Sequence, residues 1–288
     1  MSAHVPEISS DRRESVPSIL ETEAAGEIAD IYADIRRTLR TSVVNLIWRN
    51  LATMPGALRW TWSAVRPLYL GPASGHAEAV RRTLALPDIP ELSVNELLAA
   101  GVDATALTGI RGVLDSYYHT NALALVVLSA LLALDDPAGV EDVLPVQVVR
   151  DAAPIELPAL PPMAALEPGV RRLIGELNAF GEDGDPYLIA SMYRHLAYWP
   201  GYLTLVRAML APLQADGSLN ALTRSARALG RAHGLPLSRR LAPAQPPESV
   251  ATALAACRLF VEHPIARMTG ICAIIRRATP EQAPAAVE

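Results

Sequence analysis

Apolar residues recur along most of this chain at the spacing of amphipathic helices. Ile28, Ile31, Tyr32 and Ile35 fall on one face of a first predicted helix. Alternating runs of β-branched and aromatic residues, which are typical of strands, are almost absent, while Ala, Leu and Arg dominate. The pattern therefore predicts an all-α protein.

The helical pattern comes in two series, separated by a segment of different composition. The first series covers residues 22–135 and the second covers residues 169–278. Residues 136–168 are rich in proline and show little periodicity, which predicts a long linker. The most apolar run, Ala122–Leu134, is too short to span a bilayer and fits a buried core helix, so no membrane partner is expected.

One string of residues occurs in both series. R-x-L-A-x-x-P-G-x-L stands at Arg49–Leu58 and again, 145 positions later, at Arg194–Leu203, and Pro67-Leu68 then matches Pro212-Leu213. Proline is tolerated in the first turn of a helix, so each copy predicts one helix ending before the proline and another beginning at it. We therefore expect two tandem helical repeats related by a pseudo-twofold axis within one compact unit, with a small-molecule pocket at their seam.

The composition of the chain excludes several classes of partner and of reaction. The chain has 288 residues, of which 51% are hydrophobic, so it can bury a large core, and its net charge of −5 argues against a nucleic-acid partner. All 25 basic residues are arginine, which excludes Schiff-base chemistry, lysine-bound pyridoxal phosphate and a P-loop lysine.

Cys257 and Cys272 are predicted to be core thiols, and no metal motif or cofactor motif is visible. The polar N-terminus does not resemble a signal peptide, so we expect a cytoplasmic protein.

The doubled string, the preceding V-N-L-I-W at Val44–Trp48 and the proline-rich linker resemble the group I D,L-2-haloacid dehalogenases, from about Glu23 to Arg277. This resemblance implies an all-helical pseudo-dimer with its active site between the repeats. It also implies a hydrolysis that needs no cofactor and removes halide from C2 of a short 2-halocarboxylic acid, with both enantiomers accepted. In that family an aspartate activates a water that displaces the halide directly, without an ester intermediate, and an asparagine helps to hold the water.

The resemblance carries over to this chain only in part. The family motif S-D-[YF]-R-A-L-A reads S-M-Y-R-H-L-A at residues 191–197, which places Met192 where the catalytic aspartate is expected. A thioether cannot accept a proton from water at neutral pH, so water activation would have to move to another residue. His119, and His195 in place of the family's alanine, are candidate replacement bases. Asp183 and Asp185 are better interpreted as members of a solvated turn.

The candidate site residues follow from the resemblance and from the local patterns. The predicted catalytic residues are Asn121, Ser191 and His119. The alternatives are a hydrogen bond within the helix for Asn121 and Ser191, and a surface or core role for His119. The side chains expected to line an apolar substrate pocket, each with a plain core role as its alternative, are Val44, Ile47, Trp48, Tyr117, Met192 and Tyr193.

Two pairs of residues leave alternatives open. Tyr117 and Tyr118 point about 100° apart on a helix, so only one of them should face a pocket. Arg49 and Arg194 occupy the same position in the two copies of the string. Each either bonds carbonyls or a carboxylate at its helix corner, or binds a substrate carboxylate.

The sequence leaves three hypotheses about function open. The first is a dehalogenase-family enzyme that hydrolyses a short 2-halocarboxylic acid. Because the usual base is missing, the second is a biosynthetic cyclase or isomerase whose apolar pocket acts by shape, and the third is a non-catalytic binding protein. The partner in each case is a small apolar molecule, with a carboxylic acid as one alternative. The sequence leaves the oligomeric state open, a homodimer included.

Overall fold

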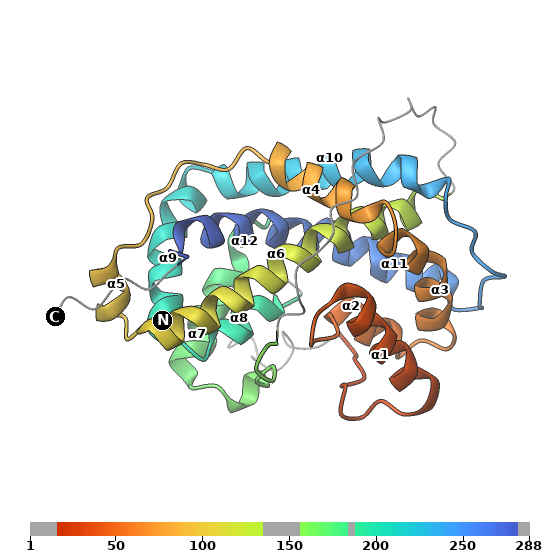
Figure 1. Cartoon of the computed structure of the whole chain (residues 1–288), viewed down its shortest axis with the longest axis horizontal. Coiled ribbons are helices and arrows are strands. Elements are labelled where there is room, and N and C mark those ends of the chain that lie inside the picture. Colours follow the sequence, from red (N-terminus) through yellow and green to blue (C-terminus); the bar gives the residue numbers. More distant parts are fainter. Residues whose placement is uncertain (1–15, 135–155, 184–187, 282–288) are drawn as a thin grey trace, which may run out of the picture.

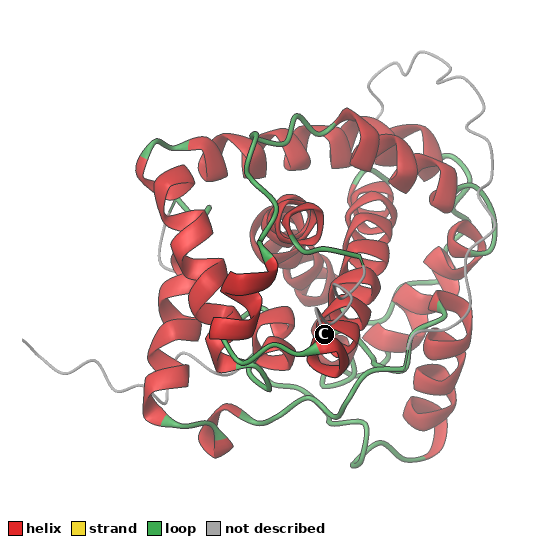
Figure 2. Ribbon diagram, turned by 60° about the vertical axis from the view of Figure 1, so that its left-hand side comes forward, coloured by secondary structure: helices red, strands yellow, loops and turns green. Residues whose placement is uncertain are grey.

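The computed structural model describes residues 16–134, 156–183 and 188–281, and the regular elements in these ranges are helices, as predicted (Figures 1 and 2). The helices of the first part are α1 (Gly26–Leu39), α2 (Leu46–Leu51), α3 (Ala57–Tyr69), α4 (Ala73–Thr83), α5 (Val94–Ala99) and α6 (Ala104–Leu132). Those of the second part are the 3₁₀ turn η2 (Met163–Ala165), α7 (Pro168–Ala179), α8 (Ser191–Leu196), α9 (Pro200–Ala215), α10 (Ser218–Ser238), α11 (Val250–Phe260), the π-helical turn η3 (Val261–Ile265) and α12 (Ala266–Ala278).

Helix α6 forms the centre of the molecule. Every residue from Thr120 to Leu131 is buried, because apolar side chains surround the helix here and Thr120, Asn121 and Ser129 are its only polar members. The helix packs against α4, α10 and α12, and it crosses between α1–α3 at one end of the molecule and α7–α9 at the other (Figure 1). The core helix expected from the run Ala122–Leu134 is therefore confirmed.

The two helix corners of the doubled string differ in detail. In the second copy α8 ends at Leu196 and α9 begins at Pro200, as predicted. In the first copy α3 begins two residues later, at Ala57, because Gly56 takes a left-handed conformation with φ of 74°. The internal duplication and its pseudo-twofold axis stay a prediction.

The described end of the proline-rich segment forms hydrogen bonds with both parts of the protein. Residues 136–155 of the predicted linker lie outside the described ranges. Leu157 donates its amide to Ser42 Oγ at 2.9 Å, and the carbonyls of Pro158 and Pro161 accept bonds from His195 and Arg194. The end of the segment is thus held against both parts of the protein.

Helices α6 and α10 approach closely at a glycine. A Cβ atom added to Gly234 would lie 2.7 Å from the backbone nitrogen of Ala130 and from Ser129 Cβ, which is closer than packed atoms allow. We expect Gly234→Ala to lower the free energy of unfolding by about 1–3 kcal/mol, because the helices must move apart. Gly175→Ala is the matched control, since nothing described lies within 4 Å of its added Cβ. That control should be neutral or stabilising by up to about 1 kcal/mol in urea unfolding. Equal stability of the two variants would contradict this packing argument.

A histidine pair joins α4 to α10. His76 Nδ1 and His233 Nδ1 are 3.1 Å apart. Burial lowers the pKa of His76 from 6.5 to about 4, with further lowering by His233 and Arg240, and burial also lowers the pKa of His233. Both rings are therefore neutral at neutral pH, and one ring nitrogen donates to the other.

This pair predicts a loss of stability in acid. The unfolded chain takes up protons below pH 6.5 that the folded protein excludes until about pH 4, so the free energy of unfolding should fall across this window. We expect His76→Leu to reduce the slope of unfolding free energy against pH between 6.5 and 4. Urea unfolding at several pH values measures this slope, and an unchanged slope would exclude His76 as its source.

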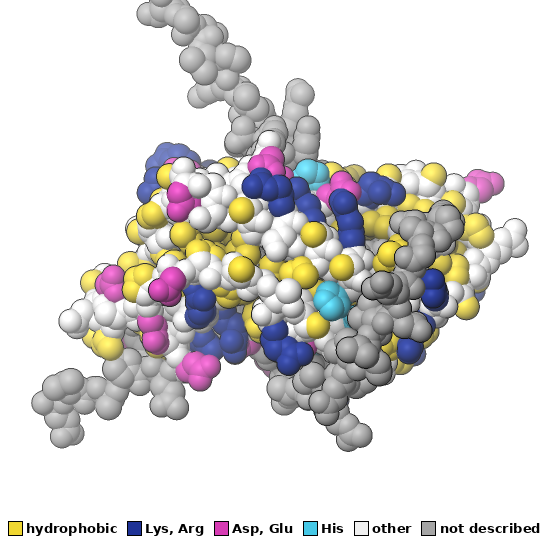
Figure 3. Space-filling model, turned by 90° about the horizontal axis from the view of Figure 1, so that it is seen from above, with side chains coloured by type: hydrophobic (Ala, Val, Ile, Leu, Met, Phe, Trp, Pro, Cys, Tyr) yellow, Lys and Arg dark blue, Asp and Glu magenta, His cyan; other side chains and the backbone are white. Residues whose placement is uncertain are grey.

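Charged side chains of both signs are interspersed with apolar ones on the face shown in Figure 3. None of the described helices is both long enough and apolar enough to cross a membrane.

Candidate functional site

A cavity of about 60 Å³ lies between the two predicted repeats. Its walls come from residues 41–49 and 116–124 of the first part and from residues 157–160, 188–192 and 260–268 of the second. The lining is mostly apolar, and no Asp or Glu is among its described residues. The volume is enough for several water molecules or for a small organic acid.

Six of the predicted site residues meet at this cavity. They are Val44, Ile47, Tyr117, Asn121, Ser191 and Met192. They come from segments that are far apart in sequence, and the structure brings them together at one cavity. Their chemical roles stay predictions.

The other three predicted residues point elsewhere. Trp48 packs edge-on against Trp62, with ring centroids 5.3 Å apart, and Tyr193 is fully buried outside the cavity lining. His119 Nε2 lies 3.2 Å from the carbonyl oxygen of Leu39. The reason is the rotation of about 100° per residue along a helix. Trp48 and Tyr193 each directly follow a residue that lines the cavity, and His119 lies midway between Tyr117 and Asn121, so these three side chains point in other directions.

One face of α6 supplies the polar groups of the cavity. Tyr117 and Asn121 are four residues apart, and therefore lie above one another on this face. Asn121 is 6% exposed, and its Nδ2 has no hydrogen-bond partner in the described part of the chain. A buried amide N–H without a partner is costly, so this group favours a bound acceptor such as water. Tyr118 does not line the cavity, as the spacing predicted.

A buried network positions the opposite wall. Asn178 accepts from the Ala190 amide at 2.9 Å and donates to the Leu188 carbonyl at 3.0 Å. Arg267 Nη2 donates to Asn178 Oδ1 at 2.9 Å, and Glu182 lies 3.5 Å from Arg267 Nη1 and balances its buried charge. These bonds hold the segment that enters α8, and with it Ser191 and Met192, against the cavity.

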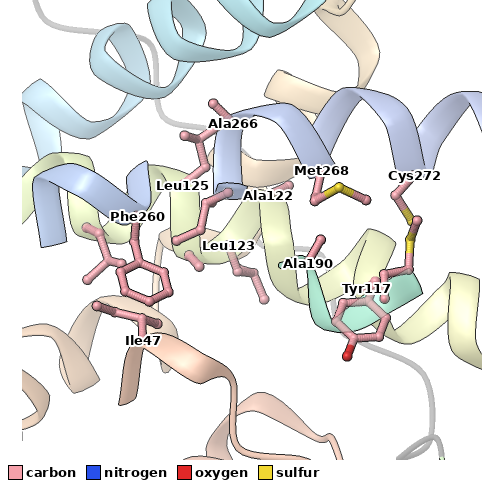
Figure 4. Close-up of a cluster of buried hydrophobic side chains, with 14 of the residues drawn as sticks. Ile47, Tyr117, Ala122, Leu123, Leu125, Ala190, Phe260, Ala266, Met268 and Cys272 are labelled. Atoms are coloured by element: carbon pink, nitrogen blue, oxygen red, sulfur yellow. The ribbon is translucent and has the colours of Figure 1, made fainter. Parts of the chain in front are cut away.

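Apolar side chains complete the walls. Figure 4 shows Ile47 of α2 beside Phe260 of α11, and Tyr117 of α6 beside Ala190. The π-helical turn η3 follows Phe260 and contains Pro264, which lacks the N–H that a continuous α-helix would use. This turn places Pro264 and Ile265 at the cavity.

Arg49 is the cavity residue whose environment the sequence did not reveal. It is only 7% exposed, and among the described residues none forms an ion pair with it or accepts a hydrogen bond from its Nε. Glu21 is near enough to raise the pKa of Arg49 against the lowering by burial, but the Glu21 oxygens bind Arg36 and the Val44 amide. A buried cation without its own counter-ion favours an anionic ligand.

Arg194, at the same position in the other copy of the string, is used differently. Its Nε and Nη2 donate to the carbonyl oxygen of Pro161, at 3.1 and 2.7 Å. This is a bond to a backbone carbonyl, but the carbonyl belongs to the proline-rich segment and not to the helix corner that the sequence suggested. Arg194 is thus held by this segment, while Arg49 lines the cavity.

Tyr117 connects the cavity to His195. Tyr117 Oη is 2.7 Å from His195 Nδ1, and His195 Nε2 is 3.1 Å from the Pro158 carbonyl oxygen. Burial raises the pKa of Tyr117 well above its usual value, opposed by the charges of Arg49 and Arg194 and by a hydrogen bond from Ser191. Burial lowers the pKa of His195 to about 4, and the same two arginines act in the same direction.

Other candidate groups lie away from this chemistry. Cys257 and Cys272 are buried free thiols, as predicted, and burial raises the pKa of both. Asp183 binds Asn220 at 2.6 Å, whereas Asp185 lies outside the described residues. Within the ranges that the structure describes, no group of three or more His, Cys, Asp or Glu side chains could hold a metal ion.

Comparison with known proteins gives this geometry a context. No family model matches the chain. It is 28% identical over 232 residues to a configuration-inverting 2-haloacid dehalogenase of Alcaligenes xylosoxydans xylosoxydans, which covers 76% of this chain and 77% of that protein. A second configuration-inverting 2-haloacid dehalogenase, of Pseudomonas sp. (strain 113), is 27% identical over 231 residues, covering 75% and 74%. The chain is a homologue of the group I 2-haloacid dehalogenases.

Solved dehalogenases share the fold of this homologue. A D-2-haloacid dehalogenase in complex with L-LA superimposes with a TM-score of 0.72 at 17% identity, over 97% of this chain and 99% of that chain. A mutant of a D-2-haloacid dehalogenase with D-2-CPA gives a TM-score of 0.71 at 16% identity, over 93% and 97%. The all-helical architecture of this dehalogenase homologue is therefore that of known enzymes.

Proposed function

We propose that this dehalogenase homologue hydrolyses short 2-halocarboxylic acids, replacing the halogen at C2 by a hydroxyl group from water. The observation that carries the proposal is the Arg49 guanidinium, buried in a small apolar cavity without a counter-ion among the described residues. A carboxylate is the planar anion that a guanidinium binds best, through two parallel hydrogen bonds. Substrate binding would then neutralise a charge that is costly to bury.

The remaining walls suit the rest of such a substrate. With its carboxylate at Arg49, C2 and the halogen lie against apolar side chains that include Val44, Ile47 and Met192. A thioether is polarisable and adapts to irregular shapes, which suits contact with a halogen. A cavity of about 60 Å³ is in keeping with an acid of short chain.

Asn121 supplies the group that holds the attacking water. Its unpartnered Nδ2 can donate to a water oxygen, leaving the hydrogens of that water free to be given up. A water fixed at the cavity wall attacks C2 from the side opposite the halide. Positioning of this kind accounts for a large part of the barrier reduction in displacement reactions. Direct attack inverts the configuration at C2, in keeping with the configuration-inverting enzymes to which the chain is similar.

The homology favours this reaction over the two other functions that the sequence left open. The similar proteins of known activity are dehalogenases, so neither a cyclase or isomerase nor a pure binding protein has a matching relative among them. The cavity also offers a cation for a carboxylate, which an isomerase of apolar compounds would not need.

Halide release tests the proposal. Purified protein is incubated separately with each enantiomer of 2-chloropropionate, chloride is measured with an ion-selective electrode, and the lactate is resolved on a chiral column. We expect chloride and lactate in equal amounts, with lactate of inverted configuration. Absence of chloride from both enantiomers and from the bromo analogues would exclude the function.

A single turnover in H₂¹⁸O tests the direct attack. With enzyme in excess, direct displacement places ¹⁸O from the solvent in the product hydroxyl. An ester intermediate would instead deliver ¹⁶O from the protein in the first turnover. Product without ¹⁸O would contradict the proposed mechanism while leaving the overall reaction intact.

A further inference from the structure

Tyr117, His195 and the Pro158 carbonyl form a chain of two hydrogen bonds, and the carbonyl fixes the direction of both. The Pro158 oxygen can only accept, so His195 Nε2 carries the hydrogen, and Nδ1 of the neutral ring is an acceptor. Tyr117 therefore donates its hydroxyl hydrogen to Nδ1 across 2.7 Å. The lone pairs of Tyr117 Oη remain able to accept from donors in the cavity.

A water held by Asn121 lies within reach of Tyr117. The two side chains are neighbours on one face of α6, where residues four apart have Cβ atoms roughly 5–6 Å apart. One water can accept from Asn121 Nδ2 and donate to Tyr117 Oη. Asn121, water, Tyr117 and His195 then form a chain that ends at a fully buried imidazole.

We propose that His195 takes up, through the Tyr117 hydroxyl, the proton that the attacking water loses. This inference rests on the proposed hydrolysis of 2-haloacids. It assigns to a tyrosine–histidine pair the role of general base, for which the family motif predicts an aspartate at position 192. Tyr117 is the residue that meets the water. His195 acts from behind it and does not line the cavity.

The step balances as follows. The water oxygen forms a bond to C2 with its lone pair, while the bond from C2 to the halogen breaks and the halide leaves with that electron pair. The water gives one proton to Tyr117 Oη as Tyr117 gives its own proton to His195 Nδ1. The products are the 2-hydroxy acid, halide and an imidazolium whose Nε2–H stays bonded to Pro158.

The electrostatics of the site agree with a concerted transfer. The raised pKa of Tyr117 disfavours a free tyrosinate, so its hydroxyl must lose one proton as it gains the other. The pKa of His195, about 4, makes this imidazole about as basic as an ordinary aspartate, the base that it replaces. Arg49 and Arg194 face both groups, and a bound substrate carboxylate would offset the charge of Arg49 as the imidazolium forms.

Chloride release by variants tests the relay. Tyr117→Phe keeps the ring and removes only the hydroxyl, and His195→Ala removes the acceptor. Each should lower kcat for 2-chloropropionate by about 10²–10⁴-fold, the range of general-base catalysis, with little change in KM. The double variant should lose no more than either single one, because the two groups act as a unit. Tyr118→Phe is the matched control, since the neighbouring tyrosine lies between Arg81 and Arg276 outside the cavity lining, and its rate should equal that of the wild type.

Two readouts separate proton transfer from a structural role. In mixtures of H₂O and D₂O the wild-type rate should curve with deuterium content, because two protons move together, and the rates of both variants should be linear. The wild-type kcat/KM should fall as pH drops through about 4, while this fall is absent in His195→Ala.

The outcomes are distinct. Chloride release by the wild type at rates that Tyr117→Phe and His195→Ala do not change would overturn the relay and leave the proposed function standing. Losses that multiply in the double variant, with a linear solvent-isotope dependence in the wild type, would also overturn it. Absence of chloride release from the wild type would overturn the relay together with the proposed function.

Discussion

Arg49→Met is expected to lower kcat/KM for 2-chloropropionate by about 10²–10³-fold, corresponding to about 3–4 kcal/mol for two charge-assisted hydrogen bonds to the carboxylate. The same change should raise the free energy of unfolding. Arg49 is 7% exposed with no ion-pair partner among the described residues, so methionine of similar length removes an uncompensated buried charge. Chloride release and urea unfolding measure the two effects, which should have opposite signs.

Arg194→Met is the matched control for this prediction. The two arginines hold the same position in the doubled string, but Arg194 donates to the Pro161 carbonyl. Its replacement removes this bond and should lower the free energy of unfolding by about 1–3 kcal/mol. If Arg49→Met also lowered stability and left turnover intact, Arg49 would be a structural residue and the proposed substrate orientation would be wrong.

Asn121→Leu is expected to lower kcat by about 10²-fold or more, because the water then lacks the donor that fixes it for attack. KM should change little, since the amide meets the water and not the carboxylate. The folded protein should tolerate the change, because Asn121 Nδ2 has no hydrogen-bond partner within the described ranges. Steady-state kinetics over a range of substrate concentrations separates kcat from KM.

Asn50→Leu provides the comparison. Asn50 is also a buried amide, but its Nδ2 donates to the Pro17 carbonyl at 2.8 Å and it does not line the cavity. We expect this variant to lose stability and to retain its turnover. A loss of turnover in Asn50→Leu as large as that in Asn121→Leu would show that activity follows folding rather than the position of the amide.

The fold was largely predictable because its signals are local. Helical periodicity and the near absence of strand patterns required nothing beyond neighbours a few residues apart. The apolar run at Ala122–Leu134 indicated a core helix, and α6 occupies the centre of the molecule. The corner at Pro200 began a helix as expected, while at Pro55 the helix begins two residues later, after Gly56 with its positive φ. A glycine follows the proline in both copies, so the local sequence does not decide between the two conformations.

The candidate site was predictable only in outline. The resemblance led to Tyr117, Asn121, Ser191 and Met192, which line one cavity although they come from distant segments. Trp48 was predicted beside Ile47, but its side chain packs against Trp62, and Arg49 lines the cavity instead. Helical rotation decides which of two neighbours faces inward, and an unaligned single sequence does not report that rotation for a helix buried on several sides.

His195 shows what pattern alone cannot resolve. In the sequence it is an isolated histidine in place of an alanine, with no motif to mark it. Its link to Tyr117 depends on α8 packing against α6 and on the Pro158 carbonyl, which fixes its tautomer. Both contacts join residues more than thirty positions apart, so they exist only in the folded chain.

The sequence by itself determined the helical architecture and contains the doubled arginine string, because both depend on residue spacing along the chain. The division into two repeats stays a prediction. Only the tertiary structure decided what surrounds the two arginines. Arg194 donates to a backbone carbonyl, whereas Arg49 is buried at the cavity without a counter-ion among the described residues. A shared motif therefore places its arginine in two different environments, because the energy of a buried charge depends on what the rest of the fold places around it.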